Sequence, residues 1–353
     1  MSAAWLLYGA YGYTGTLIAH RARARGHAPI LAGRDPEKLA ALGARLGLPT
    51  RTAALDDPQA LAAALSGCAA VLHAAGPYSA TARPMVEAAL AARAHYLDVT
   101  GEIGVLESVL RDAARARTAG VALIPGVGFD VVPTDCLAAD LALRLPAAVA
   151  LELAIHAIGS PSRGTARTAL EGLGHGGWAR RDGQIVSVPL AWRTRRVPFA
   201  DRERGAVTIP WGDVATAFHS TGIPNVAVYL AMPPSRIRAL AILDRLRPVL
   251  RASAVQRLLR RRIDRTIAGP DAAARAAGRS EVWGEVVDAT GRTVSGTLSA
   301  PEGYTFTADA AVRAVERVLA GVAPGAWTPS RAFGARFVLD CDGVVPGGSA
   351  FVG

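Results

Sequence analysis

Residues 8–15 of the chain read YGAYGYTG and directly follow the short apolar run AAWLL at residues 3–7. The spacing places three glycines between a predicted buried strand and a predicted helix. In that context Gly9 allows a sharp exit from the strand, Gly12 lets the backbone approach a diphosphate, and Gly15 lets helix and strand pack closely. The start of the helix adds N–H groups and a partial positive charge. The stretch therefore predicts a dinucleotide-binding turn.

The chain after this turn continues as an alternation of short apolar strands and helices. Strands are predicted at residues 4–8, 28–33, 50–55, 69–75, 95–100 and 121–126, and helices at 15–25, 35–47, 57–67, 81–94 and 103–117. Strands separated by helices of this length indicate a parallel sheet with right-handed crossovers. The sequence therefore predicts an α/β chain with an N-terminal Rossmann-type doubly wound parallel sheet.

The pattern changes near Pro146. A long alternating strand is predicted over 148–158, further strands at 184–189, 206–209 and 225–231, and a hairpin over 280–300. This pattern indicates a second α+β domain built on a mixed sheet. We therefore expect a Rossmann domain at 1–145, a substrate and dimerisation domain at 146–305, and a C-terminal helix and tail at 306–353 that return to the first domain.

The residues near the glycines indicate which nucleotide is bound. Tyr11, Tyr13 and Thr14 fill the loop, and the Thr14 hydroxyl can donate to a phosphate. Arg34, in AGRD, stands where NAD-binding chains carry an acidic residue that binds the ribose 2′-OH. A guanidinium there pairs with a 2′-phosphate, which favours NADPH over NADH. The alternative is that Arg34 is an ordinary solvated charge.

The fourth predicted strand ends in HAAGPYS at residues 73–79. Loops at the carboxyl ends of strands line the cofactor crevice of a doubly wound sheet. Ala75, Gly76 and Pro77 offer a small backbone surface to the nicotinamide ribose. Tyr78 is predicted to reach the nicotinamide or the substrate as a catalytic group. Its alternative is an aromatic lid without a part in proton transfer.

Two later loops at the same edge carry carboxylates. YLDVTGE at 96–102 supplies Gly101 and Glu102, which we expect near the cofactor, and GVGFDVVPTD at 126–135 supplies Asp130 as a catalytic candidate. Each acid could instead cap a helix.

These segments together resemble one known family. GAYGYTG, AGRDPEKL, AAGPYS, HYLDVTGE and GFDVVPTD are similar to the saccharopine dehydrogenase-like reductases. SRGTARTALE (162–171), WGEVVDATGRTVSGTLSAPEGYTFTADAA (283–311) and TPSRAFG (328–334) resemble the branch that contains trans-acting enoyl reductases. The resemblance implies an NADP-binding Rossmann domain and a second domain that covers the nicotinamide and forms a homodimer.

The resemblance also implies a substrate class. GLGHGGWARR at 172–181 lacks the cationic pattern with which saccharopine-forming enzymes hold substrate carboxylates. We therefore expect an acyl, polyketide or lipid-like substrate and reduction of a C=C bond. The alternatives are reduction of an imine C=N bond and a non-catalytic NADP(H)-binding sensor.

Reduction of an enoyl group needs an electrophile at the carbonyl oxygen and a proton donor. The predicted helix start at Ser162, Arg163, Gly164 and Thr165 offers N–H groups, hydroxyls and a guanidinium to a substrate. Its alternative is an ordinary serine N-cap. His175 lies in a glycine-rich stretch that could close over substrate and donate a proton. Its alternative is a surface histidine on a hinge.

Composition excludes several other classes. The formal charge of +10 comes almost wholly from scattered arginines, since Lys38 is the only lysine, and no nucleic-acid-reading motif accompanies them. Three cysteines lie far apart, without metal-ligand or disulfide spacing, so no metal site is expected. No apolar run approaches the roughly 20 residues that cross a bilayer. We expect a cytoplasmic protein that binds no nucleic acid.

Residues 235–266 combine leucines and arginines at helical spacing, interrupted by Pro248. Such a segment suits docking to an acidic acyl carrier protein, or peripheral association with an anionic membrane surface. The alternative is a helix packed on its own domain, with its arginines in solvent.

Overall fold

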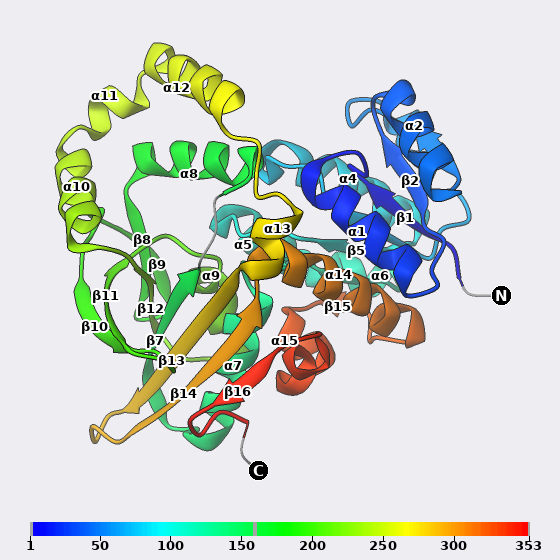
Figure 1. Cartoon of the computed structure of the whole chain (residues 1–353). Coiled ribbons are helices and arrows are strands. Elements are labelled where there is room, and N and C mark those ends of the chain that lie inside the picture. The colour runs from blue at the N-terminus through cyan, green and yellow to red at the C-terminus, as the bar shows by residue number, and fades with distance from the viewer. Residues whose placement is uncertain (1–2, 158–160, 352–353) are drawn as a thin grey trace. The chain divides into compact units, whose positions relative to one another are not determined.

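The computed structural model describes residues 3–157 and 161–351 and forms two compact units, each built from two stretches of the chain (Figure 1). Unit 1 comprises Met1–Val132 and Tyr304–Phe337, and unit 2 comprises Pro133–Gly303 and Val338–Gly353.

Unit 1 contains a seven-stranded parallel sheet with the strand order β15-β6-β5-β4-β1-β2-β3. Its strands are β1 (Trp5–Tyr8), β2 (Ile30–Gly33), β3 (Thr50–Thr52), β4 (Ala70–His73), β5 (His95–Asp98), β6 (Ala122–Ile124) and β15 (Gly325–Ala326). All residues of β1, β2 and β4 are buried, as expected for central strands covered on both faces. The predicted doubly wound parallel sheet is confirmed.

The helices of unit 1 differ in how they begin, and two of them start at an aspartate that caps the helix through its side chain. The helices are α1 (Tyr13–Ala24), α2 (Pro36–Leu46), α3 (Pro58–Leu65), α4 (Tyr78–Ala92), α5 (Ile103–Arg111), α6 (Ala113–Ala119), α14 (Gly303–Ala320) and α15 (Pro329–Phe333), and a 3₁₀ turn spans Ala335–Asp340. The Asp35 carboxylate accepts from the Lys38 N–H at 3.1 Å, and Asp57 caps α3 in the same way. The single helix expected at 103–117 is two helices, which meet at Asp112.

Helices cover both faces of this sheet. Apolar residues of α3, α4, α5 and α6 pack in one cluster with alternate residues of the strands. On the other side α14 lies along α1 (Figure 1), where Arg21 pairs with Asp309 at 2.5 Å and Arg25 with Glu316 at 2.8 Å. A segment from the end of the chain thus completes the N-terminal unit.

Unit 2 contains a nine-stranded mixed sheet with the main order β10-β11-β12-β7-β13-β14-β16, joined at β12 by the β8–β9 hairpin. Its strands are β7 (Ala148–Ala157), β8 (Gly177–Arg181), β9 (Gln184–Val188), β10 (Thr194–Pro198), β11 (Glu203–Thr208), β12 (Asn225–Ala231), β13 (Arg279–Asp288), β14 (Thr293–Pro301) and β16 (Val345–Gly347). Strands β7 and β12 are parallel, and the other pairs are antiparallel. The predicted mixed sheet is confirmed.

The helices of unit 2 are α7 (Val132–Arg144), α8 (Arg163–His175), α9 (Asp213–Thr221), α10 (Pro234–Arg245), α11 (Arg247–Arg251), α12 (Ser253–Thr266) and α13 (Ala272–Ala277). Helix α7 was expected in the first domain, but Leu137 and Leu141 lie against Gly284 of β13. The boundary therefore falls after Val132 and not at residue 145.

Two further expectations differ from the structure. The tail does not all return to unit 1, because β16 pairs with β14 of unit 2. Residues 172–181 are not a glycine-rich loop either. They form the end of α8 and strand β8, joined at Gly176, whose φ of +87° makes the turn.

Candidate active site

The glycine turn of unit 1 is fixed by contacts that only glycine allows. Gly9 has a φ of +81°, and a Cβ there would lie 2.8 Å from the Cβ of Ala75. A Cβ on Gly15 would lie 2.2 Å from the Gly9 carbonyl oxygen, so α1 packs directly on the turn. Gly12 is the N-cap of α1 and, as a glycine, has no side chain with which to cap the helix. The first N–H groups of α1 therefore fit a nucleotide diphosphate.

A group of cations lies at the carboxyl end of β2. The Tyr11 ring lies where a Cβ of Gly33 would be, and the Lys38 ammonium lies 5.7 Å from the centroid of that ring. Arg34 is exposed, and Lys38 pairs with Asp35 at 2.6 Å. Sequence reasoning selected Arg34 and missed Lys38. The available signal was that the only lysine follows Arg34 by four residues.

Tyr13 and Thr14 form the first turn of α1. The Tyr13 ring packs edge-on against Tyr304 of α14, with the ring centroids 4.9 Å apart. Thr14 is partly exposed. Tyr13 is thus a packing residue, and Thr14 keeps an accessible place beside the uncapped helix start.

The loop after β4 is held by side-chain bonds to its carbonyl groups. Gly76 and Pro77 are exposed and Ala75 is partly buried. The Thr81 hydroxyl donates a hydrogen bond to the Ala75 carbonyl oxygen at 2.7 Å, and it lies 3.0 Å from the Pro77 carbonyl oxygen. Tyr78 does not lie in this loop, because it is the first residue of α4.

The Tyr78 side chain packs inward. Its ring meets His73 edge-on with 5.3 Å between centroids, and its hydroxyl lies 3.4 Å from the His73 carbonyl oxygen. Burial raises the pKa of Tyr78 well above its usual value, and the nearby charges of Asp98, Glu102 and Asp130 act in the same direction. Tyr78 therefore holds its proton too firmly to be the best acid of this site.

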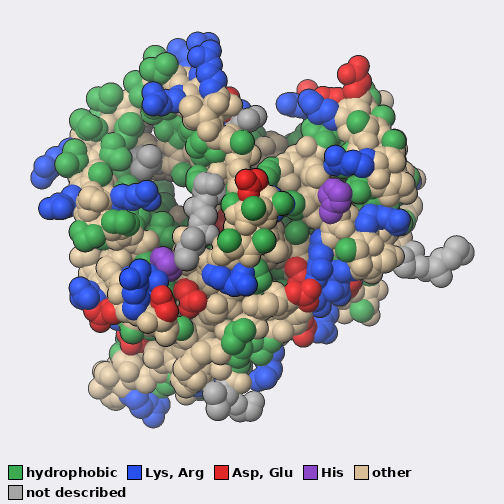
Figure 2. Space-filling model, in the orientation of Figure 1, with side chains coloured by type: hydrophobic (Ala, Val, Ile, Leu, Met, Phe, Trp, Pro, Cys, Tyr) green, Lys and Arg blue, Asp and Glu red, His purple; other side chains and the backbone are tan. Residues whose placement is uncertain are grey.

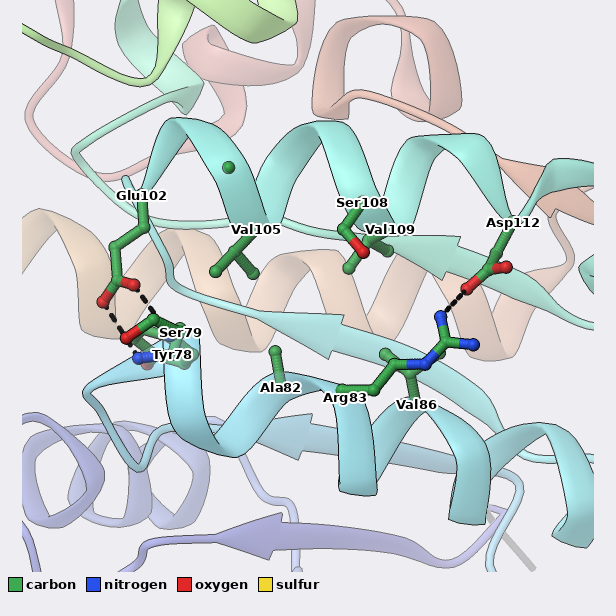
Figure 3. A pocket seen from close by; sticks show the side chains of 11 residues that line it. Tyr78, Ser79, Ala82, Arg83, Val86, Glu102, Val105, Ser108, Val109 and Asp112 are labelled. Carbon is green, nitrogen blue, oxygen red and sulfur yellow. Dashed lines mark hydrogen bonds and ion pairs between the residues drawn. The ribbon is translucent and has the colours of Figure 1, made fainter.

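Glu102 was expected to contact the cofactor, but its carboxylate is engaged by the protein. It accepts hydrogen bonds from the N–H groups of Tyr78 at 2.9 Å and Ser79 at 2.7 Å, and so caps α4 (Figure 3). Figure 3 shows these residues at one end of a pocket of about 360 Å³ between α4 and α5, with the Arg83–Asp112 ion pair at the other. Of the predicted site residues, Tyr78 and Glu102 line this pocket, and the glycine turn and Arg34 do not.

Asp98 organises the carboxyl end of β5. It is fully buried and accepts from the N–H groups of Thr100 and Gly126, both at 2.9 Å, and from the Tyr96 hydroxyl at 2.7 Å. Burial raises the pKa of Asp98 to about 6. Sequence reasoning did not single out Tyr96 as the partner of Asp98. The signal was the two-residue spacing, which puts both side chains on one face of the strand.

Asp130 lies against the backbone of Gly101. A Cβ on Gly101 would lie 2.8 Å from the Asp130 Cβ and 2.9 Å from its Oδ2, so Gly101 makes room for this carboxyl. Burial raises the pKa of Asp130 to about 6. Among the described residues, no hydrogen bond or ion pair engages the Asp130 side chain. Asp130 thus combines a free carboxyl with a pKa close to neutrality.

The predicted substrate segment lies in unit 2. Ser162 is the N-cap of α8 and its Oγ accepts from the Thr165 N–H at 3.3 Å, which is the structural alternative named above. Gly164 and Thr165 are exposed, whereas the side chains of Arg163 and His175 fall outside the described part of the chain. Contact of this segment with a substrate stays a prediction.

Three findings relate the chain to known proteins. A family model described as NAD(P)H-binding matches residues 9–122. Trans-acting enoyl reductases of Mycobacterium tuberculosis and Mycobacterium ulcerans are 35% and 33% identical to the chain over 138 residues. Saccharopine dehydrogenase (L-Glu forming) from Saccharomyces cerevisiae matches 98% of this chain and 100% of its own, with a TM-score of 0.66 and 13% identity. The predicted family resemblance is confirmed.

The part of the chain that matches the NAD(P)H-binding model includes the glycine turn, Arg34 and the loop after β4. The sequence matches cover 37% of this chain and 33% of each relative, so the chain spans about a third of the length of the curated relatives it matches. The likeness to the yeast enzyme concerns the fold alone.

Proposed function

We propose that the chain is an NADPH-dependent reductase that saturates the C=C bond of an acyl, polyketide or lipid-like enoyl substrate. The observation that carries this proposal is the 35% identity over 138 residues to a protein named trans-acting enoyl reductase, together with the match of residues 9–122 to an NAD(P)H-binding model. The free Asp130 carboxyl in the same unit supports it, because enoyl reduction needs a proton as well as a hydride.

NADPH, when bound, supplies the hydride for this chemistry. The uncapped start of α1 and the turn at Gly9 and Gly12 would hold its diphosphate. Arg34 and Lys38 would receive the 2′-phosphate, and the Tyr11 ring beside them would contact the adenosine end. An exposed arginine and lysine at this place favour NADPH over NADH.

Asp130 is the proton donor of this proposal. A carboxyl with a pKa of about 6 keeps a useful protonated fraction near neutral pH, which an ordinary aspartate does not. Tyr78 is not the acid of this proposal, because its pKa is raised well above the usual value. His73, whose pKa burial lowers to about 3, is neutral at neutral pH and supplies no proton there.

The test measures the rate at which the full chain oxidises NADPH in the presence of a short enoyl thioester. The same rate is measured with a keto acid plus an amine. We expect oxidation with the thioester, formation of the saturated thioester by mass spectrometry, and weaker binding of NADH than of NADPH. Oxidation only with the keto acid and amine would identify an imine reductase instead. Tight NADPH binding without turnover of either substrate would identify a sensor.

A further inference from the structure

Helices α10, α11 and α12 follow one another along one edge of unit 2 (Figure 1), and we call residues 234–266 the arginine row. The row contains ten arginines and two aspartates, a net charge of +8 where the whole chain has +10. Nearly all of the excess positive charge is thus concentrated in a tenth of the chain. The proposed reductase function uses none of these residues.

The inner side of the arginine row packs on its own unit. Helices α11 and α12 lie against α8, where Arg167 pairs with Asp264 at 2.5 Å. The other aspartate, Asp244, accepts from the Leu190 N–H at 2.7 Å and pairs with Arg247 at 3.2 Å. Both acidic groups are therefore engaged toward the unit, and neither neutralises the outward arginines.

The outer side carries charges that the protein does not pair. Seven exposed arginines make no hydrogen bond or ion pair through their side chains within the described part of the chain; they are Arg236, Arg238, Arg245, Arg257, Arg261, Arg262 and Arg265. In α12, Arg257, Arg261 and Arg265 recur at intervals of four residues, which places them on one face.

Aliphatic side chains are exposed between these arginines. Four of the seven large hydrophobic residues that are exposed in the described chain belong to the row: Ile242 at 56%, Leu246 at 47%, Val249 at 57% and Leu258 at 67%. Neither α10 nor α12 has a fully buried residue. Figure 2 shows green and blue atoms interspersed over this part of the molecule.

We propose that the arginine row docks the protein on an anionic lipid bilayer. Guanidinium groups would bind phosphate headgroups while the exposed aliphatic side chains enter the acyl boundary, the arrangement of interfacial amphipathic helices. Among the described residues no helix is apolar and long enough to span a membrane, so this association is peripheral.

The composition of the row favours a bilayer over a protein partner. Protein interfaces concentrate aromatic residues in a contiguous buried centre. The arginine row contains no aromatic residue, and its exposed aliphatic side chains are separated by arginines. A fluid anionic surface can pair with such a dispersed pattern of arginines, whereas one rigid partner would leave part of it unpaired.

The test is flotation of the full chain with vesicles of phosphatidylcholine and phosphatidylglycerol, and with vesicles of phosphatidylcholine alone. We expect binding to the anionic vesicles only. The variant R257E/R261E/R265E should weaken that binding by about a hundredfold or more, because each basic side chain near an anionic surface contributes severalfold. The matched control is R23E/R45E/R117E, which makes the same change of net charge at exposed arginines of α1, α2 and α6. This control variant should bind the anionic vesicles more tightly than R257E/R261E/R265E does.

A second variant separates insertion from simple charge attraction. Leu258→Ser leaves the charge unchanged and should weaken vesicle binding severalfold. Failure of the wild type to bind anionic vesicles, or equal losses in the two arginine variants, overturns the proposal. So does selective binding of an acidic carrier protein without vesicle binding. Because the readout is flotation and not turnover, failure of the proposed reductase activity leaves this result unaffected.

Discussion

At the scale of single residues, the fold places Asp130 where its charge is disfavoured, because burial raises the pKa of this carboxyl to about 6. Between about pH 4 and pH 6 the Asp130 carboxyl therefore keeps its proton in the native state, whereas in the unfolded chain, where an aspartate has a pKa of about 4, it is deprotonated. Stability from this group is largest at low pH and declines as the pH rises from about 4 to about 6. If Asp130 donates the proton, kcat should decline above pH 6 for the same reason.

Asp130→Asn should lower kcat by about a hundredfold or more, the usual contribution of a general acid, and should remove the decline of kcat above pH 6. The amide keeps the shape and removes only the transferable proton. The Kd for NADPH, measured by calorimetry, should stay within a few-fold of the wild type. Asp98→Asn serves as the control, because Asp98 has a similar pKa but three hydrogen bonds within the fold. An unchanged pH profile in Asp130→Asn removes Asp130 from the reaction.

Sequence reasoning succeeded for residues whose role depends on the local backbone. Gly9 and Gly15 occupy the predicted turn, and the close contacts of their missing Cβ atoms explain why. It did not identify partners that come from elsewhere in the chain, although helix capping was the alternative given for Glu102. Glu102 caps a helix that begins 24 residues earlier, and Thr307 accepts from the Phe129 N–H across 178 residues. No local pattern specifies such partners.

At the scale of elements, the contact between β1 and α1 depends on Gly15. Gly15→Ala would place a Cβ about 2.2 Å from the Gly9 oxygen, so helix α1 must move away from the turn. We expect a loss of about 1–3 kcal/mol in the free energy of unfolding, as for other overpacked positions. The affinity for NADPH should fall by about tenfold or more, because the N–H groups of α1 move with the helix.

The matched control is Gly104→Ala, which lies in the first turn of α5 and has open space at its Cβ. Alanine there should stabilise the chain by up to about 1 kcal/mol, because alanine favours helix, and should leave NADPH binding unchanged. Equal effects of the two substitutions in denaturation and calorimetry would show that α1 and β1 are not closely coupled.

Elements with strong local signals were predicted well. The aspartate–proline helix starts at residues 35 and 57 and the hairpin of β13 and β14 lie where the sequence indicated them. The strand β8 was missed, because GLGHGGWARR contains four glycines, and glycine is depleted in strands. Its pairing with β9 and packing of Gly177 against Val188 override that propensity.

At the scale of the whole molecule, the units are discontinuous in sequence, which composition and periodicity do not reveal. The C-terminal helix and tail at 306–353 were expected to return to the first domain. Helices α14 and α15 and strand β15 lie in unit 1, but the chain from Val338 belongs to unit 2. The amphipathic pattern of α14 shows that one face is covered. It does not show by which unit, because any apolar surface could cover it.

This arrangement predicts opposite results for two truncations. A chain that ends at Gly303 loses α14, with its buried Phe306 and its ion pairs to Arg21 and Arg25, so unit 1 exposes one side of α1. We expect this chain to bind NADPH weakly or not at all in calorimetry. A chain that ends at Phe337 keeps unit 1 and loses only β16 and the contacts of the tail with unit 2. It should bind NADPH with nearly the affinity of the full chain and should denature at a lower temperature. Tight NADPH binding by the chain ending at Gly303 would mean that unit 1 is complete without α14.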